Sequence, residues 1–500
     1  MGLPIPNHPA LKGPFTPMRF EATVEDCIVT EGEIPKEISG GFYRCGPTYK
    51  RPTKNGAVSL LTMDGMVQGL TIENGKANFR NRWVQTPKYL LEQEHDRGMF
   101  EWADDRFHDY RTWGYGKATR DEYTTGIPQG TPNINIFPFQ GEVLALAEVG
   151  LPPMALDPWT LETKGMVPWS PQLAGGLIPS EENGAGTFTA HPKWDQATGD
   201  VYGWAYGDLP PYVTLHLVKA DGTVKTRPLD DAPYNTVAHD IWLTEEWMVM
   251  PFQPFIIGHD RVRDDKGIFG WNPELPIILA LIPRNLEGEV RYITTDLDPQ
   301  YVMHCGGARV VGRKLQLDAP IFNRPPFPTE HDLNPGDSAT LFFSVASSYP
   351  GRWEVDLDTG RVTADRLSER PAELPKIDER FYGQNYTSGF MISGDPKNDG
   401  MTMNSLTTQN PSTLAEAHYR IRDKEPAAVL EGTFARRHAG ADQMDGWIIV
   451  PVSKWKANMG EYLIFDTYDI ESGPVARIEI PFRLGWNAHG SWMDFDDIKN

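Results

Sequence analysis

The amino-acid sequence predicts an all-β protein of the propeller type, on three observations. Its 500 residues include 47 glycines and 43 prolines, so chain-breaking residues recur too often for long helices. Short runs of β-branched and aromatic residues lie between them, which is typical of strands. Strands and helices do not alternate as they would around a parallel sheet. Repeated strand–turn–strand units over a chain of this length favour a propeller over two separate sandwiches.

Local signals place individual strands, turns and helices. Turns in which Asp or Asn comes shortly before a Gly are predicted at 72–79, 195–200, 219–224 and 356–361. Apolar runs of strand length lie at 142–149, 240–252, 275–283, 446–452 and 462–470. Helical spacing occurs at 86–100 and 411–421, and we expect both helices outside the sheets. No low-complexity linker divides the chain, so we expect one domain over residues 1–500.

The composition excludes several classes of function. A formal net charge of −21, without a run of lysines and arginines, opposes binding to nucleic acids. The three cysteines, Cys27, Cys45 and Cys305, are too few for a disulfide framework, which favours a reducing, cytoplasmic location. The N-terminus does not resemble a secretory signal, and the run at 275–283 is too short for a transmembrane helix. The sequence offers no G-x-S-x-G, P-loop or G-x-G-x-x-G motif, so hydrolase and nucleotide chemistry lack support.

Four of the twelve histidines share a context that sets them apart. His191 in "FTAHPKWD", His239 in "NTVAHDIWL", His304 in "QYVMHCGGARV" and His489 in "GWNAHGSWM" each follow small or apolar residues. Any one of them alone is readily explained as a hydrogen-bonded core histidine. Their separations of 48, 65 and 185 residues match no local metal-binding motif. They also fit ligands that different blades contribute to a central axis, so the residues by themselves leave both interpretations open.

A resemblance to a known family favours the metal-ligand interpretation. Seven segments resemble the carotenoid cleavage oxygenase family, in its lignostilbene and isoeugenol oxygenase branch, and they occur in family order over nearly the whole chain. Each segment alone is a weak signal, whereas seven in order are a strong one. They are "EGEIPKEISGGFYRCGP" (31–47), "MDGMV" (63–67), "ALAEVGLPPMALDPWTLET" (145–163), "TAHPKWD" (189–195), "AHDIWLTEEW" (238–247), "ELPKIDERF" (373–381) and "GPVARIEIPFRLGWNAHGSW" (473–492).

The resemblance implies a seven-bladed β-propeller with a few helical and loop inserts that cap an axial metal. It also implies one non-haem Fe(II) per chain, bound by His191, His239, His304 and His489. Neutral imidazoles suit Fe(II) and leave coordination positions for O₂, but they cancel none of the metal's charge. Carboxylates are therefore expected behind them, each accepting the second ring N–H of a histidine. By resemblance, Glu148 is expected to partner His239, and Glu373 to partner His304.

Two positions near the ligands depart from the family pattern. Many carotenoid-cleaving relatives have a third glutamate shortly before the last ligand, where this chain has Pro474, as the stilbene-like branch often does. The partner of His489 is therefore unassigned. Cys305, Gly306 and Gly307 follow the third ligand, where relatives usually have larger residues, which predicts either a wider cavity or a close backbone approach. The Cys305 thiol itself is expected to be buried and inert.

The chemistry that the resemblance implies is oxidative scission of a carbon–carbon double bond by O₂, with both oxygen atoms ending in two carbonyl products. We expect a dioxygenase that acts on a small, hydrophobic aromatic alkene. This substrate would be a phenylpropenoid such as isoeugenol or 4-vinylguaiacol, giving an aldehyde such as vanillin, or a stilbene. Relatives that cleave 4-hydroxystilbenes typically bind the phenol through a tyrosine and a lysine. Here Ala147 stands at the lysine position, and the candidate tyrosines are Tyr110, Tyr115 and Tyr123.

Two alternatives stay open. An apocarotenoid substrate would fit the same family, although no apolar membrane-docking segment is evident, which favours the more soluble aromatic alkenes. A catalytically inactive propeller that serves as a binding module is an alternative of a different class. That module would be expected to lack some of the metal ligands, whereas all four histidines are present.

Overall fold

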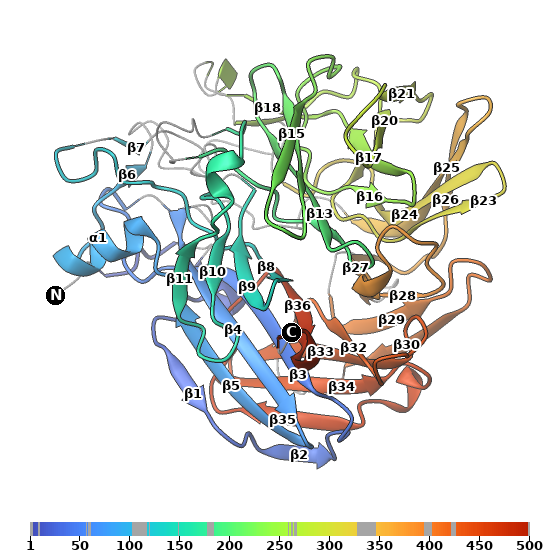
Figure 1. Cartoon of the computed structure of the whole chain (residues 1–500). Helices are drawn as coiled ribbons and strands as arrows, with labels where there is room; N and C mark the ends of the chain where they lie inside the picture. The colour runs from blue at the N-terminus through green and yellow to red at the C-terminus, as the bar shows by residue number, and fades with distance from the viewer. Residues whose placement is uncertain are drawn as a thin grey trace.

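In the computed structural model, seven antiparallel sheets of four to six strands are arranged around a central axis (Figure 1). The structure describes residues 4–8, 11–56, 58, 62–102, 118–119, 121–148, 150–177, 185–258, 260–261, 264, 268–327, 347–394, 403–421 and 427–498. Each of the seven sheets is one blade of a β-propeller. The expected seven-bladed propeller is therefore confirmed.

Each of the first four blades has four or five strands, given in order from the axis outward. Blade 1 consists of β36 (His489–Asp494), β3 (Gly40–Thr48), β4 (Asp64–Glu73), β5 (Lys76–Trp83) and β1 (Ala22–Val24). Blade 2 consists of β8 (Asn135–Phe139), β9 (Glu142–Leu146), β10 (Met154–Leu156) and β11 (Thr163–Met166). Blade 3 consists of β12 (Lys193–Asp195), β13 (Asp200–Tyr206), β14 (Val213–Val218) and β15 (Val224–Pro228). Blade 4 consists of β16 (Trp242–Leu243), β17 (Trp247–Phe252), β20 (Ile278–Pro283) and β21 (Arg291–Thr294).

The remaining three blades complete the ring. Blade 5 consists of β22 (Tyr301–Val302), β23 (Ala308–Val311), β24 (Lys314–Phe322), β25 (Ser348–Asp356) and β26 (Val362–Arg366). Blade 6 consists of β27 (Ala372–Ile377), β28 (Gly389–Ser393), β29 (Ser405–Gln409) and β30 (Glu416–Arg420). Blade 7 consists of β31 (Ala428–Val429), β32 (Thr433–Arg436), β33 (Gly446–Lys454), β34 (Met459–Asp466), β35 (Ala476–Ile480) and β2 (Val29–Gly32).

The two ends of the chain close this ring. The C-terminal strand β36 is the innermost strand of blade 1, where it pairs with β3. The N-terminal strand β2 is the outermost strand of blade 7, where it pairs with β35. Figure 1 shows β36 near the centre of the molecule and β1 and β2 at its rim. Because His489 begins β36, this closure is also what carries the last predicted ligand to the axis.

The apolar core lies between neighbouring blades. One cluster joins blades 3 and 4, and others join blades 1 and 7, 4 and 5, 6 and 7, 1 and 2, and 2 and 3. Blade strands such as β14, with the sequence VTLHLV, are therefore buried on both faces and read as continuous apolar runs. This packing leaves the inner ends of the blades free to carry polar groups at the axis.

The predicted turns and strands are largely present. Asn74 and Gly75 turn between β4 and β5 with φ values of 52° and 74°, the left-handed conformation that Asn and Gly tolerate. The other three predicted turns join β12 to β13, β14 to β15 and β25 to β26. The run at 240–252 is a hairpin of β16 and β17 rather than one strand. The run at 275–283 contributes β20, a buried blade strand.

The helix predicted at 86–100 is confirmed over 87–95, and the other predicted helix is wrong. Helix α1 (Pro87–His95) begins at Thr86, whose side chain accepts a hydrogen bond from the Tyr89 N–H. The stretch at 411–421 forms a turn followed by β30. The Asn410 carboxamide holds that turn by accepting two backbone N–H bonds, and pairing with β29 overrides the helical spacing.

The remaining elements are small inserts and terminal segments. They are the short helix α4 (Phe495–Ile498), the two-stranded pairs β6 (Glu101–Trp102) with β7 (Ala118–Thr119) and β18 (Phe255–Ile257) with β19 (Phe269–Trp271), and the 3₁₀ turns η2 (Gly13–Phe15), η6 (Ser170–Gln172), η7 (Glu379–Phe381) and η8 (Ile470–Ser472). Over the described residues, every helix is too short or too polar to cross a membrane.

His216 is a buried histidine of the blade core rather than of the axis. Its side chain on β14 lies within hydrogen-bonding distance of the Thr226 hydroxyl and of the Ala174 carbonyl oxygen. Burial lowers the pKa of His216 to about 4. When the pH falls below about 6.5, the pKa of histidine in the unfolded chain, His216 is protonated in the unfolded chain but stays neutral in the folded one.

This difference predicts that His216 makes the fold less stable as the pH falls from 6.5 toward 4. The loss between pH 7 and pH 5 is about 2 kcal/mol by linkage. We expect His216→Gln, which cannot titrate, to have a smaller drop in Tm over that range than the unmodified protein. A parallel change at the exposed His438 serves as the control. Equal drops in Tm for the His216 variant and the unmodified protein would rule out this role.

Candidate metal centre

The structure brings all four predicted histidines together on the propeller axis. One ring nitrogen from each of His191, His239, His304 and His489 lies within 4.8 Å of those of the other three, and all four side chains are buried. The ring centroids of neighbouring pairs are 4.5–5.1 Å apart. Histidines up to 298 residues apart in the sequence, from position 191 to position 489, thus form one compact cluster.

Hydrogen bonds from neighbouring blades fix the backbone beside each of the first two histidines. The His191 N–H donates to the Thr189 hydroxyl, and the Asn135 carboxamide on blade 2 donates to the Ala190 carbonyl at 2.7 Å. The buried Trp204 indole on blade 3 donates to the Ala238 carbonyl, the residue before the second histidine. Both ring positions therefore depend on contacts between blades.

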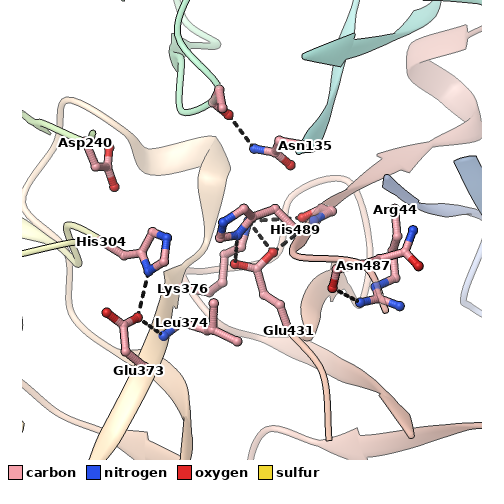
Figure 2. A network of polar contacts seen from close by, with 12 residues as sticks. Arg44, Asn135, Asp240, His304, Glu373, Leu374, Lys376, Glu431, Asn487 and His489 are labelled. Carbon is pink, nitrogen blue, oxygen red and sulfur yellow. Dashed lines mark hydrogen bonds and ion pairs between the residues drawn. The ribbon is translucent and has the colours of Figure 1, made fainter. Parts of the chain in front are cut away.

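The segments around the other two histidines are fixed in the same way. The Asp240 carboxylate accepts the Cys305 N–H at 2.8 Å, which ties the residue after His239 to the residue after His304. The same carboxylate forms a buried ion pair with Lys193 at 2.6 Å. On blade 1, the buried Arg44 guanidinium donates to the Asn487 carbonyl at 2.7 Å (Figure 2).

Three buried carboxylates accept the outer N–H of three of the rings. Glu148 pairs with His239 Nδ1, and Glu373 Oε2 accepts from His304 Nδ1 at 2.7 Å. These are the two contacts that the resemblance implies. With a carboxylate on each Nδ1–H, Nε2 is the atom that carries the free lone pair toward the axis.

The third carboxylate is Glu431, which the sequence did not suggest. Its Oε1 accepts from His489 Nδ1 at 2.9 Å, and its Oε2 accepts the Gly490 N–H at 2.9 Å (Figure 2). Many carotenoid-cleaving relatives have their third glutamate at the position of Pro474. In this chain that position precedes the outer strand β35 and lies away from the axis. Glu431 reaches His489 because the segment between β31 and β32 lies at the inner edge of blade 7, next to β36. The missing partner of the fourth histidine is therefore supplied 58 residues upstream.

Each blade contributes one residue to this centre. Blades 3, 4, 5 and 1 supply the histidines, and blades 2, 6 and 7 supply the carboxylates. Nearly all of these residues lie in or beside an innermost strand. The sevenfold architecture thus distributes four imidazoles and three carboxylates around one point.

Burial and neighbouring charges set the protonation states. Burial, followed by the other three rings, lowers the pKa of His191 well below the ordinary value, and burial with the rings of His489 and His239 does the same for His304. Burial also lowers the pKa of His239, but the Glu148 carboxylate outweighs it and the net shift is upward. Burial raises the pKa of Glu373 to about 8. Burial acts in the same direction on Glu431, where Lys376 and His489 outweigh it and bring the pKa to about 2.

The donor set fits a divalent metal ion. The buried Nε2 of His191 has no hydrogen-bond partner among the described residues, which is costly unless a cation satisfies it. The Nε2 atoms of His239 and His304 lie 3.1 Å apart, although each ring already donates its Nδ1 proton to a carboxylate. Two facing lone pairs at this distance repel one another unless a cation lies between them. Neutral imidazole nitrogens are good ligands for iron and other divalent transition metals.

A large cavity opens above the histidines. Its volume is about 1340 Å³, and His239, His304 and His489 form its floor together with the three carboxylates. The inserts cap it, because η2 contributes Phe15 and the β18–β19 pair contributes aromatic rings. Phe255, Phe269 and Phe327 form one aromatic wall, with ring centroids 5.2–6.1 Å apart. The cavity therefore has one aromatic wall and a polar floor.

The residues predicted near a substrate phenol do not form an anchor in the described structure. Ala147 is buried, and among the described residues that line the cavity there is no lysine. Tyr123 is exposed and packs against His95, whereas Tyr110 and Tyr115 lie outside the described residues.

The glycines after the third histidine permit close packing rather than a wider cavity. A Cβ atom on Gly307 would lie 2.2 Å from the Tyr386 ring, and one on Gly306 would lie 2.8 Å from the Asp318 carbonyl oxygen. Neither glycine lines the large cavity. Cys305 is a free, buried thiol, and burial raises its pKa well above the ordinary value, as the sequence predicts for an inert cysteine.

The structure is thus a propeller with four buried imidazoles that could hold a metal ion, at the foot of a large cavity. The model of the retinal pigment epithelial membrane protein family matches residues 15–494, so the chain belongs to this family, that of the carotenoid oxygenases. Its members include oxygenases similar to this chain over nearly its whole length, and the chain is accordingly an oxidoreductase of that kind.

Three similar proteins are named as oxygenases of isoeugenol or lignostilbene. Isoeugenol monooxygenase from Pseudomonas nitroreducens is 31% identical over 97% of this chain and 98% of its own length. Lignostilbene-α,β-dioxygenase isozyme III from Sphingomonas paucimobilis is 27% identical over 98% of both chains. The crystal structure of lignostilbene dioxygenase from Pseudomonas brassicacearum superimposes with a TM-score of 0.83 at 29% identity, covering 98% of this chain and all of that one.

Proposed function

We propose that the chain is a non-haem Fe(II) dioxygenase that cleaves the side-chain double bond of a small aromatic alkene. The substrate would be a phenylpropenoid such as isoeugenol or 4-vinylguaiacol, or a stilbene, and the products two carbonyl compounds, such as vanillin and a short aldehyde. The observation that supports the proposal most strongly is the cluster of four buried imidazoles directly beneath a cavity with an aromatic wall.

In this proposal, one iron ion is held by the Nε2 atoms of His191, His239, His304 and His489. The iron, when bound, supplies the capacity to bind and activate O₂. Glu148, Glu373 and Glu431 keep the proton of each partner ring on Nδ1 and orient that ring. No side chain needs to act as a general acid or base, since scission adds oxygen without a net proton transfer to the alkene.

The cavity supports an aromatic substrate of modest size. Phe255, Phe269 and Phe327 offer ring faces against which an arene packs, with pair energies of roughly 0.5–1.5 kcal/mol beyond area burial. A volume of about 1340 Å³ exceeds the roughly 300–1,000 Å³ of common ligand pockets, so it accommodates a stilbene as well as a phenylpropenoid. Tyr206 also lines the cavity and donates to Glu148, which places a hydroxyl close to the floor.

The names of the relatives imply different numbers of O₂ atoms in the products, because one is called a monooxygenase and another a dioxygenase. We propose the dioxygenase outcome for this chain. Incubation under ¹⁸O₂ with isoeugenol tests it, with rapid borohydride reduction of both aldehydes to alcohols, which keeps each carbonyl oxygen and stops its exchange with water. Label in both products is expected, whereas label in one product alone would assign the monooxygenase outcome.

Activity itself is tested by assaying the iron-loaded protein with isoeugenol, 4-vinylguaiacol, resveratrol and an apocarotenal, and following aldehydes by chromatography. Vanillin from either guaiacol alkene, or 4-hydroxybenzaldehyde from resveratrol, is expected. The saturated analogue 4-propylguaiacol is the matched control and should be untouched, because it lacks the double bond. Aldehydes from the apocarotenal alone would overturn the proposed substrate class, and an inert iron-loaded protein would overturn the function.

A further inference from the structure

A second, smaller cavity lies on the propeller axis, on the side of the histidine cluster that faces away from the large cavity. Its volume is about 300 Å³. It is lined by the innermost strands of five blades, through residues that include Phe139, Trp194, Ile377, Phe434 and Trp492. The large cavity is lined instead by residues at the beginnings of those inner strands, such as those at 373–374 and 488–489. The histidine cluster therefore has an axial cavity on either side.

The side chain of Lys376 stands between the histidine cluster and this lower cavity. Its ammonium donates to Glu379 Oε1 at 2.8 Å and to the Gly490 carbonyl at 3.0 Å, and it lies 3.6 Å from Glu431 Oε2. Only 11% of the side chain is exposed, and Lys376 lines the lower cavity. Figure 2 shows it directly beside Glu431 and His489.

Together with Glu431, Lys376 holds the backbone of Gly490, the residue next to the fourth histidine. The Gly490 N–H donates to Glu431, and the Gly490 carbonyl accepts from Lys376. A Cβ atom on Gly490 would come within 2.4 Å of the Tyr43 carbonyl oxygen, so this backbone is also tightly packed on its other side. The Glu431–His489 contact therefore belongs to a network that joins blades 6, 7 and 1.

This arrangement is particular to the fourth histidine. Of the described lysines and arginines, Lys376 alone forms an ion pair with one of the three carboxylates that contact the cluster. Burying an ammonium costs desolvation free energy. We therefore expect the charge of Lys376 next to Glu431 to have a role that a neutral side chain could not take.

We propose that Lys376 is a positioning residue of the metal centre, which holds Glu431 and the His489 backbone in place and closes the axis between the histidine cluster and the lower cavity. The inference rests on the proposed metal site. It assigns to this lysine an effect on metal affinity that is separate from its effect on folding.

Co²⁺ titration of the metal-free protein, followed by calorimetry, tests the inference without relying on turnover. We expect Lys376→Met, which keeps most of the length of the side chain without its charge, to bind Co²⁺ about 10-fold more weakly, the lower end of the 10–100-fold losses seen for partners of metal ligands. The matched control is Lys88→Met, because Lys88 is also buried between two carboxylates, Asp64 and Glu92, but lines neither axial cavity. It should lower Tm and leave Co²⁺ affinity unchanged.

A second variant tests the closing role. In Lys376→Ala the lower cavity extends toward Glu431, so methylammonium should restore Co²⁺ affinity while the bulkier tetramethylammonium should not. Wild-type affinity in Lys376→Met, or no rescue of a weakened Lys376→Ala, contradicts the inference. If neither variant folds, Glu379→Gln takes their place, since that side chain is 26% exposed, and unchanged affinity there would likewise contradict it. An unmodified protein that binds no Co²⁺ would instead refute the metal site itself.

Discussion

Replacing His489 by alanine is expected to abolish metal retention and alkene cleavage while the propeller stays folded. The side chain supplies one of four ring nitrogens, and its Nδ1 is already committed to Glu431. Loss of a ligand should cost more than the 10–100-fold that loss of a ligand's hydrogen-bond partner costs, so we expect metal affinity to fall by more than about 100-fold. The backbone pairing of β36 with β3 does not involve the ring, and the removed volume adjoins an existing cavity.

The control for this result is the replacement of a buried histidine outside the cluster. His216→Gln removes such a residue from β14 and should retain iron at neutral pH. His239→Ala, a change in blade 4, should reproduce the effect of His489→Ala. Metal content is measured by atomic absorption and folding by circular dichroism. A folded His489→Ala protein with full iron content and turnover would remove this residue from the ligand set.

Replacing Glu431 by alanine is expected to have the second largest effect, a loss of roughly 10–100-fold in metal affinity and activity. The change leaves the His489 Nδ1–H and the Gly490 N–H without acceptors in a buried site. The ring can then rotate or adopt the other tautomer, with its proton directed toward the metal position. The buried Lys376 also loses one of its two neighbouring carboxylates.

Glu431→Gln separates hydrogen bonding from charge. Its amide oxygen can still accept from His489, so a smaller loss than in the alanine variant is expected. A surface change such as Glu369→Gln serves as the control, since that side chain is 83% exposed. Metal affinity is measured by iron titration, and activity by the initial rate with isoeugenol. Identical behaviour of Glu431→Ala and the unmodified protein would show that the contact has no function.

The parts of the fold that could be predicted are those that depend on local signals. The turn at Asn74 and Gly75 and the strand β33 follow from residue types that favour one conformation wherever they occur. The helix predicted at 411–421 is wrong because its spacing is overruled by β29, a neighbour that local periodicity cannot reveal. The number of blades came from the family resemblance, since the repeat is too irregular to be divided by inspection.

The site illustrates the same limit. The four histidines could be named because the segments around them resemble a family, whereas their spacing in sequence carries no metal motif. Glu431 was missed because "VLEGTF" gives no local reason to assign its carboxylate to a histidine 58 residues further on. Only the blade arrangement identifies Glu431, because it occupies in blade 7 the place that Glu373 occupies in blade 6. Lys376 is recognisable only once both axial cavities are known.

The central claim is that the four imidazoles bind one iron ion per chain. The most direct test is to load the protein anaerobically with Fe(II), remove unbound metal, and measure both iron stoichiometry and the iron K-edge X-ray absorption spectrum. The proposed site predicts one iron per chain with the multiple-scattering pattern of about four imidazoles. A protein that retains no iron, or iron surrounded mainly by oxygen or sulfur ligands, would contradict it.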